Sequence, residues 1–487
     1  SACLVGSEMC IRDRTTTTTT KHRQFLCFSD SRSEAAFFAC YMEKSYQEFL
    51  RRRGIWHVIE ECKKEGKTFL SVSSFVERLS RYFNANKTFA EWDQPENQDI
   101  DLACKRNAWI AVLNEMYNAR RSTSLASMGL LSFEYDPNTE VCSDIADEFG
   151  ISDAESKDFL NLLVMDAVYA GAILPDFKLT DADREYIFFA AKQRYMKAIK
   201  TAEDSQRSWV MGWAARKRSN GNYYPNARLA RVCRVSGRDE DYSNEILLSY
   251  WDNVFAKQRN EETTISTKDF SIRLSGDSKL HFYRCKKCGK VTPYYCKEFC
   301  SSVKCDGSLE KYDPTIDLQN NHYANLYRDT RMSPLFIKEH TAQLAKDQQT
   351  IYQQGFVNGK INALSCSTTF EMGVDVGSLE TVYMRNVPPS PANYVQRAGR
   401  AGRALHSAAF VMTYAKLSSH DFTFYNNPQK MISGLIQAPV FEIKNRKVIN
   451  RHIYAVALSS FLTAYPKVYD GDNQTVLLNE GGYDLLK

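Results

Sequence analysis

Residues 361–403 read INALSCSTTFEMGVDVGSLETVYMRNVPPSPANYVQRAGRAGR. The apolar segment 361–365 predicts a buried β-strand, and it is followed by the hydroxyl residues Ser367, Thr368 and Thr369. In an open α/β sheet, ligands bind beyond the carboxyl ends of the strands. Hydroxyl and backbone N–H groups at that edge suit phosphate oxygens. The stretch therefore predicts a sheet whose carboxyl edge binds phosphate groups.

The next residues combine glycine with a carboxylate. Gly373 and Gly377 flank Asp375. Glycine lets the backbone approach a ligand closely, and the carboxylate of Asp375 can accept a hydrogen bond from a ribose hydroxyl.

The stretch ends in QRAGRAGR, in which Arg397, Arg400 and Arg403 are three residues apart. This spacing predicts guanidinium groups on one side of a helix start, where they would repel one another unless anions bind. A solvated basic face is the alternative. The glycines within the run argue against it, because each weakens a helix by ~1 kcal/mol and gains nothing on a plain surface.

The surrounding pattern predicts one α/β domain that is divided in the sequence. Residues 24–29 predict a strand, and a polar turn leads into a helix at 33–53. After a long insertion, the pattern resumes near residue 323; a doubly wound sheet tolerates an insertion because it leaves from a surface loop. The resumed part has expected strands at 334–338, 382–385 and 408–414 and expected helices at 344–354 and 391–400.

The expected domain organisation follows from these patterns. Within the insertion, residues 145–173 have the helix–turn–helix spacing of a winged helix, with an all-α packing insert as the alternative. The expected parts are 1–20, outside the fold; 21–54, the first part of the α/β lobe; 55–280, the mainly helical insertion; 281–312, a zinc ribbon; 323–425, the rest of the lobe; and 426–487, the start of a truncated C-terminal helical region.

A cysteine cluster lies between Cys285 and Cys305. Tetrahedral zinc takes four thiolates, commonly from two close pairs. Cys285 and Cys288 form one predicted pair, followed by a glycine, and Cys300 and Cys305 form the other. Cys296 is then spare, although its pairing with Cys300 and a set of buried free thiols are alternatives. The expected Zn²⁺ site is structural, because no open ligand position or general base is apparent.

Composition adds only weak constraints. The formal net charge of +5 permits a nucleic-acid partner without requiring one. No apolar run is long enough to cross a bilayer, so we expect no membrane partner. A metal-binding cysteine cluster suggests a reducing compartment, and we expect a cytoplasmic protein.

Three motifs carry a family resemblance. FLCFSDSR at 25–32 resembles motif IV of superfamily 2 helicases, and FEMGVDVG with QRAGRAGR resembles motifs V and VI. The sequence PPSPANYVQRAGRAGR and the cysteine-bearing insertion look most like those of the MrfA-like and Lhr-like DEAD/DEAH-box helicases. The resemblance implies the second RecA-like lobe of an ATP-driven motor, with ATP and Mg²⁺ as cofactors.

The resemblance also implies residue roles. Arg400 and Arg403 would be arginine fingers that stabilise charge on the γ-phosphoryl group, and Gln396 would couple nucleotide state to lobe closure. The other implied contacts are Arg397 at the ATP interface; Gly373 and Asp375 at the ribose; and Ser31, Arg32, Thr368 and Thr369 at nucleic-acid phosphates.

The sequence lacks a complete phosphate loop, G-x-x-x-x-G-K-[ST]. Gly66-Lys67-Thr68 imitates its end, but position 61 is glutamate, and we interpret Gly66 as a helix C-cap. Asp147-Glu148 imitates the acidic pair that holds Mg²⁺, but a surface helix is the favoured interpretation. We therefore expect this chain alone to be inactive as an ATPase.

The N-terminal segment supports the same expectation. Residues 4–14, LVGSEMCIRDR, resemble a translated transposase adapter used in sequencing-library preparation, and a low-complexity threonine run follows. A genuine disordered tail is the alternative. With the adapter interpretation, we expect a coding sequence cut upstream of residue 21.

The predicted function is the C-terminal half of an ATP-dependent helicase or translocase. Nucleic acid, by family association DNA, is the expected partner, with partner proteins of a DNA-repair or defence system. The alternative is a non-hydrolysing nucleic-acid-binding or scaffold protein with a RecA-like lobe and a zinc ribbon.

Overall fold

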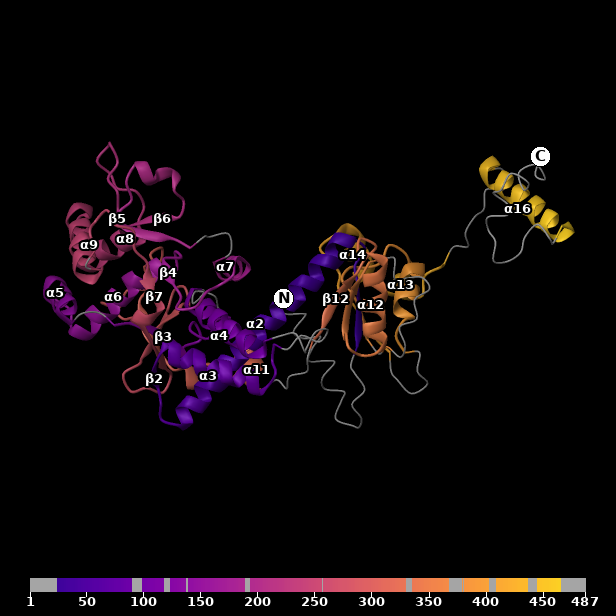
Figure 1. Ribbon diagram of the computed structural model, residues 1–487. Coiled ribbons are helices and arrows are strands. Elements are labelled where there is room, and N and C mark those ends of the chain that lie inside the picture. The colour runs from indigo at the N-terminus through magenta and orange to yellow at the C-terminus, as the bar shows by residue number, and fades with distance from the viewer. Residues whose placement is uncertain are drawn as a thin grey trace. The chain divides into compact units, whose positions relative to one another are not determined.

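The computed structural model describes residues 24–89, 99–117, 123–136, 139–188, 193–255, 257–329, 335–367, 379, 381–402, 409–436 and 445–465. By its internal contacts the chain divides into two units, 1–384 with 400–412 and 385–399 with 413–487 (Figure 1). The predicted adapter-like segment 1–20 lies outside the described residues. Within the described part, no helix has the length and apolar character needed to span a membrane.

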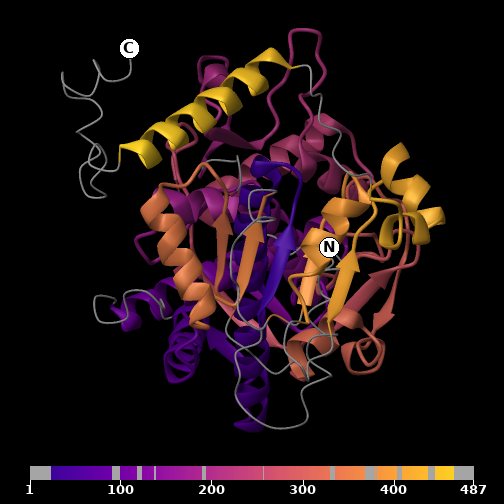
Figure 2. The same cartoon turned by 90° about the vertical axis from the view of Figure 1, so that its right-hand side faces the viewer.

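A five-stranded sheet of order β12-β13-β1-β14-β15 forms the first unit's α/β lobe. Its strand β1 is separated from the others by more than 300 residues of sequence, yet it lies between β13 and β14 and runs parallel to both (Figure 2). The predicted α/β class with a parallel, divided sheet is therefore confirmed. The strands are β1 (Phe25–Phe28), β12 (Ile337–His340), β13 (Ala363–Cys366), β14 (Thr381–Met384) and β15 (Phe410–Thr413).

The strand sequences explain why this sheet is buried. All four residues of β13, ALSC, are buried, as are three of the four residues of β1, FLCF. Strands covered on both faces read as continuous apolar runs rather than alternating patterns. Helix α2 (Arg32–Lys64) packs on β12 and β13, and α12 (Lys346–Val357) packs on β12.

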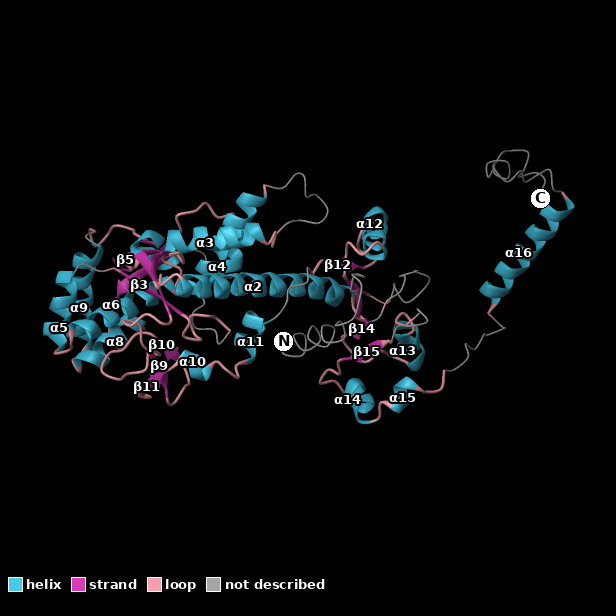
Figure 3. Cartoon of the chain, turned by 90° about the horizontal axis from the view of Figure 1, so that it is seen from below, coloured by secondary structure: helices cyan, strands magenta, loops and turns pink. Residues whose placement is uncertain are grey.

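Helix α2 is longer than the sequence analysis predicted. It continues past Arg53 to Lys64, as one unbroken rod of 33 residues (Figure 3). Phe38 and Met42 near its start join the core of the α/β lobe, whereas Ile55 and Ile59 join the core of the insertion. The expected boundary between residues 54 and 55 thus lies inside a helix that both cores share.

The insertion mixes helices with short strands around one large apolar core. Strand β8 is central in a three-stranded antiparallel sheet, β2-β8-β3, whereas β4–β7 and β5–β6 are parallel pairs. The helices are α3 (Val72–Ala85), α4 (Ile100–Tyr117), α5 (Thr139–Phe149), α6 (Asp153–Val168), α7 (Asp181–Phe188), α8 (Ala227–Ser236) and α9 (Glu240–Phe255). The strands are β2 (Phe69–Ser71), β3 (Leu131–Tyr135), β4 (Ile173–Leu174), β5 (Tyr195–Ile199), β6 (Val210–Ala214), β7 (Ile265–Ser266) and β8 (Phe270–Leu274), and the 3₁₀ turns are η1 (Glu203–Gln206) and η2 (Thr267–Asp269).

Helices α5 and α6 form the predicted helix–turn–helix. They pack together across a turn at Gly150, and Ser152 and Glu155 form a capping box at the start of α6. A winged helix also needs an antiparallel hairpin as its wing. Strand β3, which contacts α6, pairs antiparallel with β8, but these two strands are more than 130 residues apart rather than joined as a hairpin, so the winged-helix interpretation stays a prediction.

A small antiparallel sheet, β10-β9-β11, follows the insertion and carries the cysteine cluster. Its strands are β9 (Phe282–Cys285), β10 (Val291–Thr292) and β11 (Leu309–Tyr312), and the short helices α10 (Pro314–Asp317) and α11 (His322–Asp329) come next. Ala324, Leu326 and Tyr327 of α11 lie in the insertion's core, so the lobe resumes only at β12.

The second unit contains helices only, where it is described. Asp421 organises part of it, because its carboxylate accepts hydrogen bonds from the backbone N–H groups of Val387 and Lys416 and from the Ser418 hydroxyl. The helices are α13 (Pro391–Ala398), α14 (Ser419–Asn426), α15 (Gln429–Ile432) and α16 (Arg446–Ala464).

Candidate functional site

The carboxyl end of β1 leads directly into the N-terminus of α2. Ser31 is the N-cap of this helix, and its Oγ accepts a hydrogen bond from the backbone N–H of Glu34 at 3.4 Å. Arg32, the first helical residue, is exposed. The N-terminus of a helix carries free N–H groups and partial positive charge, both of which attract anions. Ser31 and Arg32 therefore lie at a helix N-terminus, and their contact with nucleic-acid phosphates stays a prediction.

Buried polar side chains gather at the carboxyl ends of the neighbouring strands. Ser29 follows β1, Thr341 follows β12 and Ser367 follows β13, and all three are completely buried. Ser29 Oγ and Thr341 Oγ1 have no hydrogen-bond partner among the described residues. His340 is also buried, and burial lowers the pKa of its imidazole, which favours packing over the alternative of nucleic-acid contact.

Much of the predicted nucleotide edge cannot be placed. Thr368, Thr369, Gly373, Asp375 and Arg403 all lie outside the described residues.

The arginine run does not form the predicted helical face. Helix α13 ends at Ala398 with Gly399 as its C-cap, so Arg397 is helical and Arg400 is not, while Arg403 lies outside the described residues. Arg397 is fully buried, whereas Gln396 before it is exposed. The expectation failed because glycine ends the helix before the second arginine, as glycine commonly does.

Arg400 lies in the first unit, at the edge of the sheet region. It is 7% exposed, and the next residue, Ala401, forms a parallel bridge with Leu379. The N–H of Gly402 donates to the Leu379 carbonyl at 2.8 Å, with Gly402 at a φ of 76°. That left-handed conformation favours glycine, and it supplies the local reason for a glycine in this run.

The two segments that imitate the phosphate loop and the acidic pair are a helix end and the exposed side of a helix, as predicted. Gly66 follows the C-cap of α2 with a φ of 70°, and the N–H of Lys67 donates to the carbonyl of Cys62 at 2.8 Å. This is the hydrogen-bond pattern of a Schellman motif. Asp147 and Glu148 lie on the exposed side of α5.

Four cysteine sulfurs converge at the end of the β9–β11 sheet. The Sγ atoms of Cys285, Cys288, Cys300 and Cys305 all lie within 4.8 Å of one another. The Cys285–Cys305 and Cys288–Cys300 sulfur separations are 3.7 and 3.6 Å. Zn–S bonds of about 2.3 Å in a tetrahedron place sulfurs about 3.8 Å apart. The donor set and its spacing therefore fit zinc, on the ligands that the sequence predicted.

The surrounding backbone lowers the pKa of one of these four thiols, that of Cys285. Burial favours the neutral thiol of Cys285, but N–H groups of Cys288 and Lys287 outweigh it and lower the pKa of Cys285 to about 7. Gly307 lies against the site, since a Cβ there would be 2.6 Å from the Cys285 sulfur. Cys296 lies outside the cluster, and burial raises its pKa to about 12.

The cysteine-bearing segment is anchored to the insertion by polar contacts. Arg234 of α8 donates to the carbonyls of Val303 and Cys305 at 2.7 and 3.0 Å, next to the second cysteine pair. The N–H of Tyr295 donates to Asp158 of α6 at 3.0 Å. Loss of the cluster's shape would therefore disturb α6 and α8 as well.

Sequence reasoning missed two arginine features. The run RRR at 51–53 has the pattern of a solvated face, yet Arg51 and Arg52 are buried, and Arg52 forms ion pairs with Glu48 and Glu115. The second feature is a basic cavity lined in part by Arg228, which is 3% exposed. Neither has a local sequence signal, because the partners come from distant elements.

Comparisons with known proteins agree with the motifs. Residues 315–405 match the family described as the helicase conserved C-terminal domain. The chain is 30% identical over 239 residues to Druantia protein DruE of Escherichia coli, covering 43% of this chain and 13% of that protein. It is 26% identical over 124 residues to the Lhr helicase/probable uracil glycosylase of Mycolicibacterium smegmatis, covering 26% of this chain and 8% of that protein.

A solved structure of the DUF1998 helicase MrfA bound to DNA is 23% identical, with a TM-score of 0.23, over 24% of this chain and 16% of that chain. The present chain thus spans only a small fraction of each of these relatives.

Proposed function

We propose that this chain, which contains the C-terminal RecA-like lobe of a superfamily 2 helicase of the Lhr and MrfA class, supplies the arginine-finger half of an ATP-dependent nucleic-acid motor. The supporting observation is the position of Arg400. It is buried beside the bridge between Ala401 and Leu379, within the matched segment 315–405.

The proposed division of roles follows the motifs. Arg400 and Arg403 stabilise charge on the γ-phosphoryl group, Gln396 couples closure to nucleotide state, and Arg397 lies at the same interface. Gly373 and Asp375 face the ribose, while Ser31, Arg32, Thr368 and Thr369 hold nucleic-acid phosphates.

ATP and Mg²⁺ need a phosphate loop, which the sequence of this chain lacks in complete form. The proposed motor is therefore assembled with a first lobe, and the chain alone does not hydrolyse ATP. The proposed zinc site has a structural role, because all four cysteines are used as ligands. DNA is the proposed substrate, in repair or in defence against foreign DNA, and the support for both is the resemblance to this helicase class.

The test uses the full-length protein. Arg403→Ala and Arg400→Ala should each lower kcat for ATP hydrolysis by about 10³-fold or more, with nucleic-acid binding retained. Arg328→Ala, which removes an exposed arginine of α11, is the matched control. Unchanged kcat in both finger variants would contradict the assignment.

A non-hydrolysing scaffold is the second candidate, and the incomplete phosphate loop favours it. It predicts that no full-length form hydrolyses ATP, whatever residues occupy positions 400 and 403. The same assay therefore separates the two functions.

A further inference from the structure

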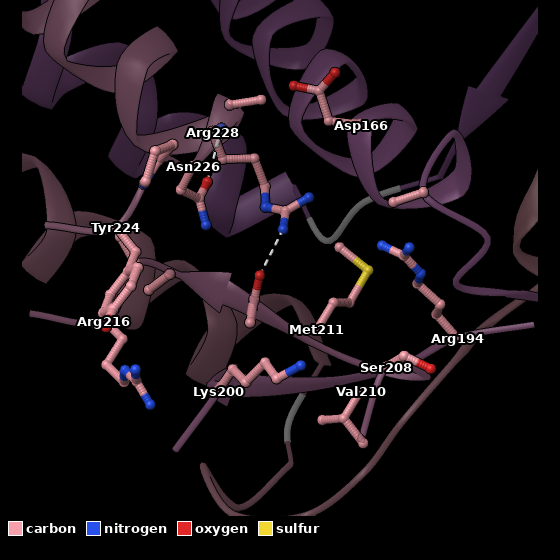
Figure 4. A pocket seen from close by; sticks show the side chains of 16 residues that line it. Asp166, Arg194, Lys200, Ser208, Val210, Met211, Arg216, Tyr224, Asn226 and Arg228 are labelled. Atoms are coloured by element: carbon pink, nitrogen blue, oxygen red, sulfur yellow. Dashed lines mark hydrogen bonds between the residues drawn. The ribbon is translucent and has the colours of Figure 1, made fainter. Parts of the chain in front are cut away.

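A basic cavity lies in the insertion, between β5, β6 and the N-terminal end of α8. Its volume is about 680 Å³, which falls in the range of ligand sites. Four cationic side chains line it, from four separate places in the sequence (Figure 4). They are Arg194, Lys200, Arg216 and Arg228.

Among the residues that line the cavity, one carboxylate stands against these four cationic groups. Asp166 is the acidic residue among those that line the cavity, and Arg231 already holds it, with Nε 2.6 Å from Oδ2 and Nη2 3.1 Å from Oδ1. In Figure 4 the Asp166 carboxylate points away from the cationic groups. The cavity therefore keeps a positive potential, which attracts anions.

Arg228 is a buried side chain that is held in a fixed position in the cavity wall. Its Nε donates to the Trp213 carbonyl at 2.8 Å and its Nη2 to the Gly212 carbonyl at 2.7 Å, so neutral backbone groups hold it. Burial and the neighbouring Arg231 lower the pKa of Arg228 to about 10, against the effect of Asp166. Lys200 is similar, because its Nζ donates to the Arg207 carbonyl at 3.0 Å.

An aromatic platform stands at the rim. Tyr224 is 42% exposed, and the guanidinium carbons of Arg216 and Arg218 each lie 4.5 Å from the centre of its ring. The loop that carries it is ordered by a bridge between Lys217 and Tyr223. Aromatic rings beside cations are the means by which proteins bind single strands without reading their sequence.

A second cavity of about 740 Å³ continues the first on the other side of this platform. The two share Asp166 and residues 224–227. The second is lined by Lys290 and Lys304 of the cysteine-bearing segment, by Arg231, and by the carboxylates of Asp166 and Glu240. Together they form a basic groove that is longer than one small anion requires.

We propose that this groove binds the phosphodiester backbone of single-stranded nucleic acid, with a base stacked on Tyr224. The inference deepens the proposed motor function, because a helicase releases single strands that must be held away from the duplex. The site is separate from the motor lobe in sequence and is built entirely from the insertion and the cysteine-bearing segment.

The binding test uses the full chain without ATP, a fluorescein-labelled (dT)₂₀ strand and fluorescence anisotropy. Arg194→Gln/Lys200→Gln should weaken binding and reduce the slope of log Kd against log salt by about 1.4, at about 0.7 for each phosphate contact. The control double variant, Lys268→Gln/Arg328→Gln, removes the same charge from exposed positions outside the groove. Equal effects of the two double variants would overturn the proposal.

Tyr224→Ala should weaken binding roughly tenfold, as expected for the loss of one stacked base. Tyr224→Phe keeps the ring and should bind like the original protein. If both variants lose affinity equally, or neither does, the stacking platform is wrong.

A cross-linking experiment locates the bound strand directly. A (dT)₂₀ strand that contains 4-thiothymidine should cross-link, on irradiation, to the peptide around residues 215–228. Cross-links confined to the motor lobe would contradict the groove. Displacement of (dT)₂₀ by equal nucleotide concentrations of thymidine monophosphate would instead identify a small-anion site. Since none of these readouts uses ATP, a failed motor assignment in ATPase assays leaves them unaffected.

Discussion

The Nε of Arg52 lies 2.8 Å from Oε1 of Glu115, and both side chains are almost completely buried. Burial alone would lower the pKa of Arg52, but Glu115 and the Tyr327 hydroxyl raise it. The other Glu115 oxygen accepts a hydrogen bond from the backbone N–H of Leu125 at 2.6 Å. The pair thereby ties α2 to α4 and to the segment after it.

Removing Arg52 should leave Glu115 as an uncompensated buried charge, whereas removing Glu115 leaves Arg52 paired with Glu48, 2.6 Å away. We expect Arg52→Met to lower the free energy of unfolding by about 3–5 kcal/mol and Glu115→Leu to lower it by less. The combined Arg52→Met/Glu115→Leu variant should lose much less than the sum, because neither charge remains. Denaturant unfolding measures all three, and additive losses would show that the residues do not act as a pair.

Gly54 is a glycine in the middle of α2, where alanine would ordinarily stabilise a helix by about 1 kcal/mol. Here a Cβ would overlap the ring of Phe83 and lie 3.0 Å from Cδ1 of Leu79, and both of those side chains are fully buried. Overpacking costs about 1–3 kcal/mol, so it should exceed the gain. We therefore expect Gly54→Ala to lower the thermal unfolding midpoint, and a raised midpoint would show that α3 can shift.

The cysteine geometry predicts which substitutions abolish metal binding. Purified protein should contain one zinc per chain, and Cys300→Ala should lose it whereas Cys296→Ala should keep it. Gly307→Ala should also reduce zinc content, because its Cβ would press on the Cys285 sulfur. Elemental analysis measures the stoichiometry. Zinc loss in Cys296→Ala but not in Cys300→Ala would reverse the ligand assignment.

Asp158 predicts a pH dependence of stability. Burial raises its pKa to about 7, and the Glu134 and Glu155 carboxylates add to the effect against the Tyr295 N–H. An unfolded aspartate has a pKa of about 3.9, so the native state binds an extra proton between these values. The stabilisation from this proton is complete below pH 4 and is lost as pH rises through 7.

Asp158→Asn cannot ionise, and its amide oxygen can still accept from Tyr295. We expect it to remove this part of the decline between about pH 4 and 7 in denaturant unfolding series. The exposed Asp144→Asn in α5 serves as the control and should leave the pH profile unchanged. Identical profiles for Asp158→Asn and the original protein would contradict the prediction.

Local patterns were sufficient for the lobe's strands and the zinc ligands. FLCF and ALSC predict strands covered on both faces, because such strands read as continuous runs of apolar or small residues. Two cysteine pairs at short spacing leave few choices for the four metal ligands. The end of α2 at Gly66 was also predictable, because a helix end and the glycine that follows its C-cap are adjacent in sequence.

The failures concern partners that are distant in sequence. RRR at 51–53 has the pattern of a surface. The burial of Arg52 depends on Glu115, more than 60 residues later, as well as on Glu48 one helical turn earlier. Strand β3 pairs with β8 across more than 130 residues, so short strands of the insertion have little local signal. The arginine run was mistaken for a helical face because spacing alone does not show where a helix ends.

The unbroken α2 also has a mechanical meaning. A linker of glycine and serine would let the lobe and the insertion fluctuate independently, but bending a helix requires hydrogen bonds to be broken or a kink-forming residue. At 33 residues the rod is about 50 Å long, and both of its ends are clamped in apolar cores. A displacement at the carboxyl end of β1, where the predicted phosphate contacts lie, would therefore be transmitted along a rigid helix into the part of the chain that contains the basic groove.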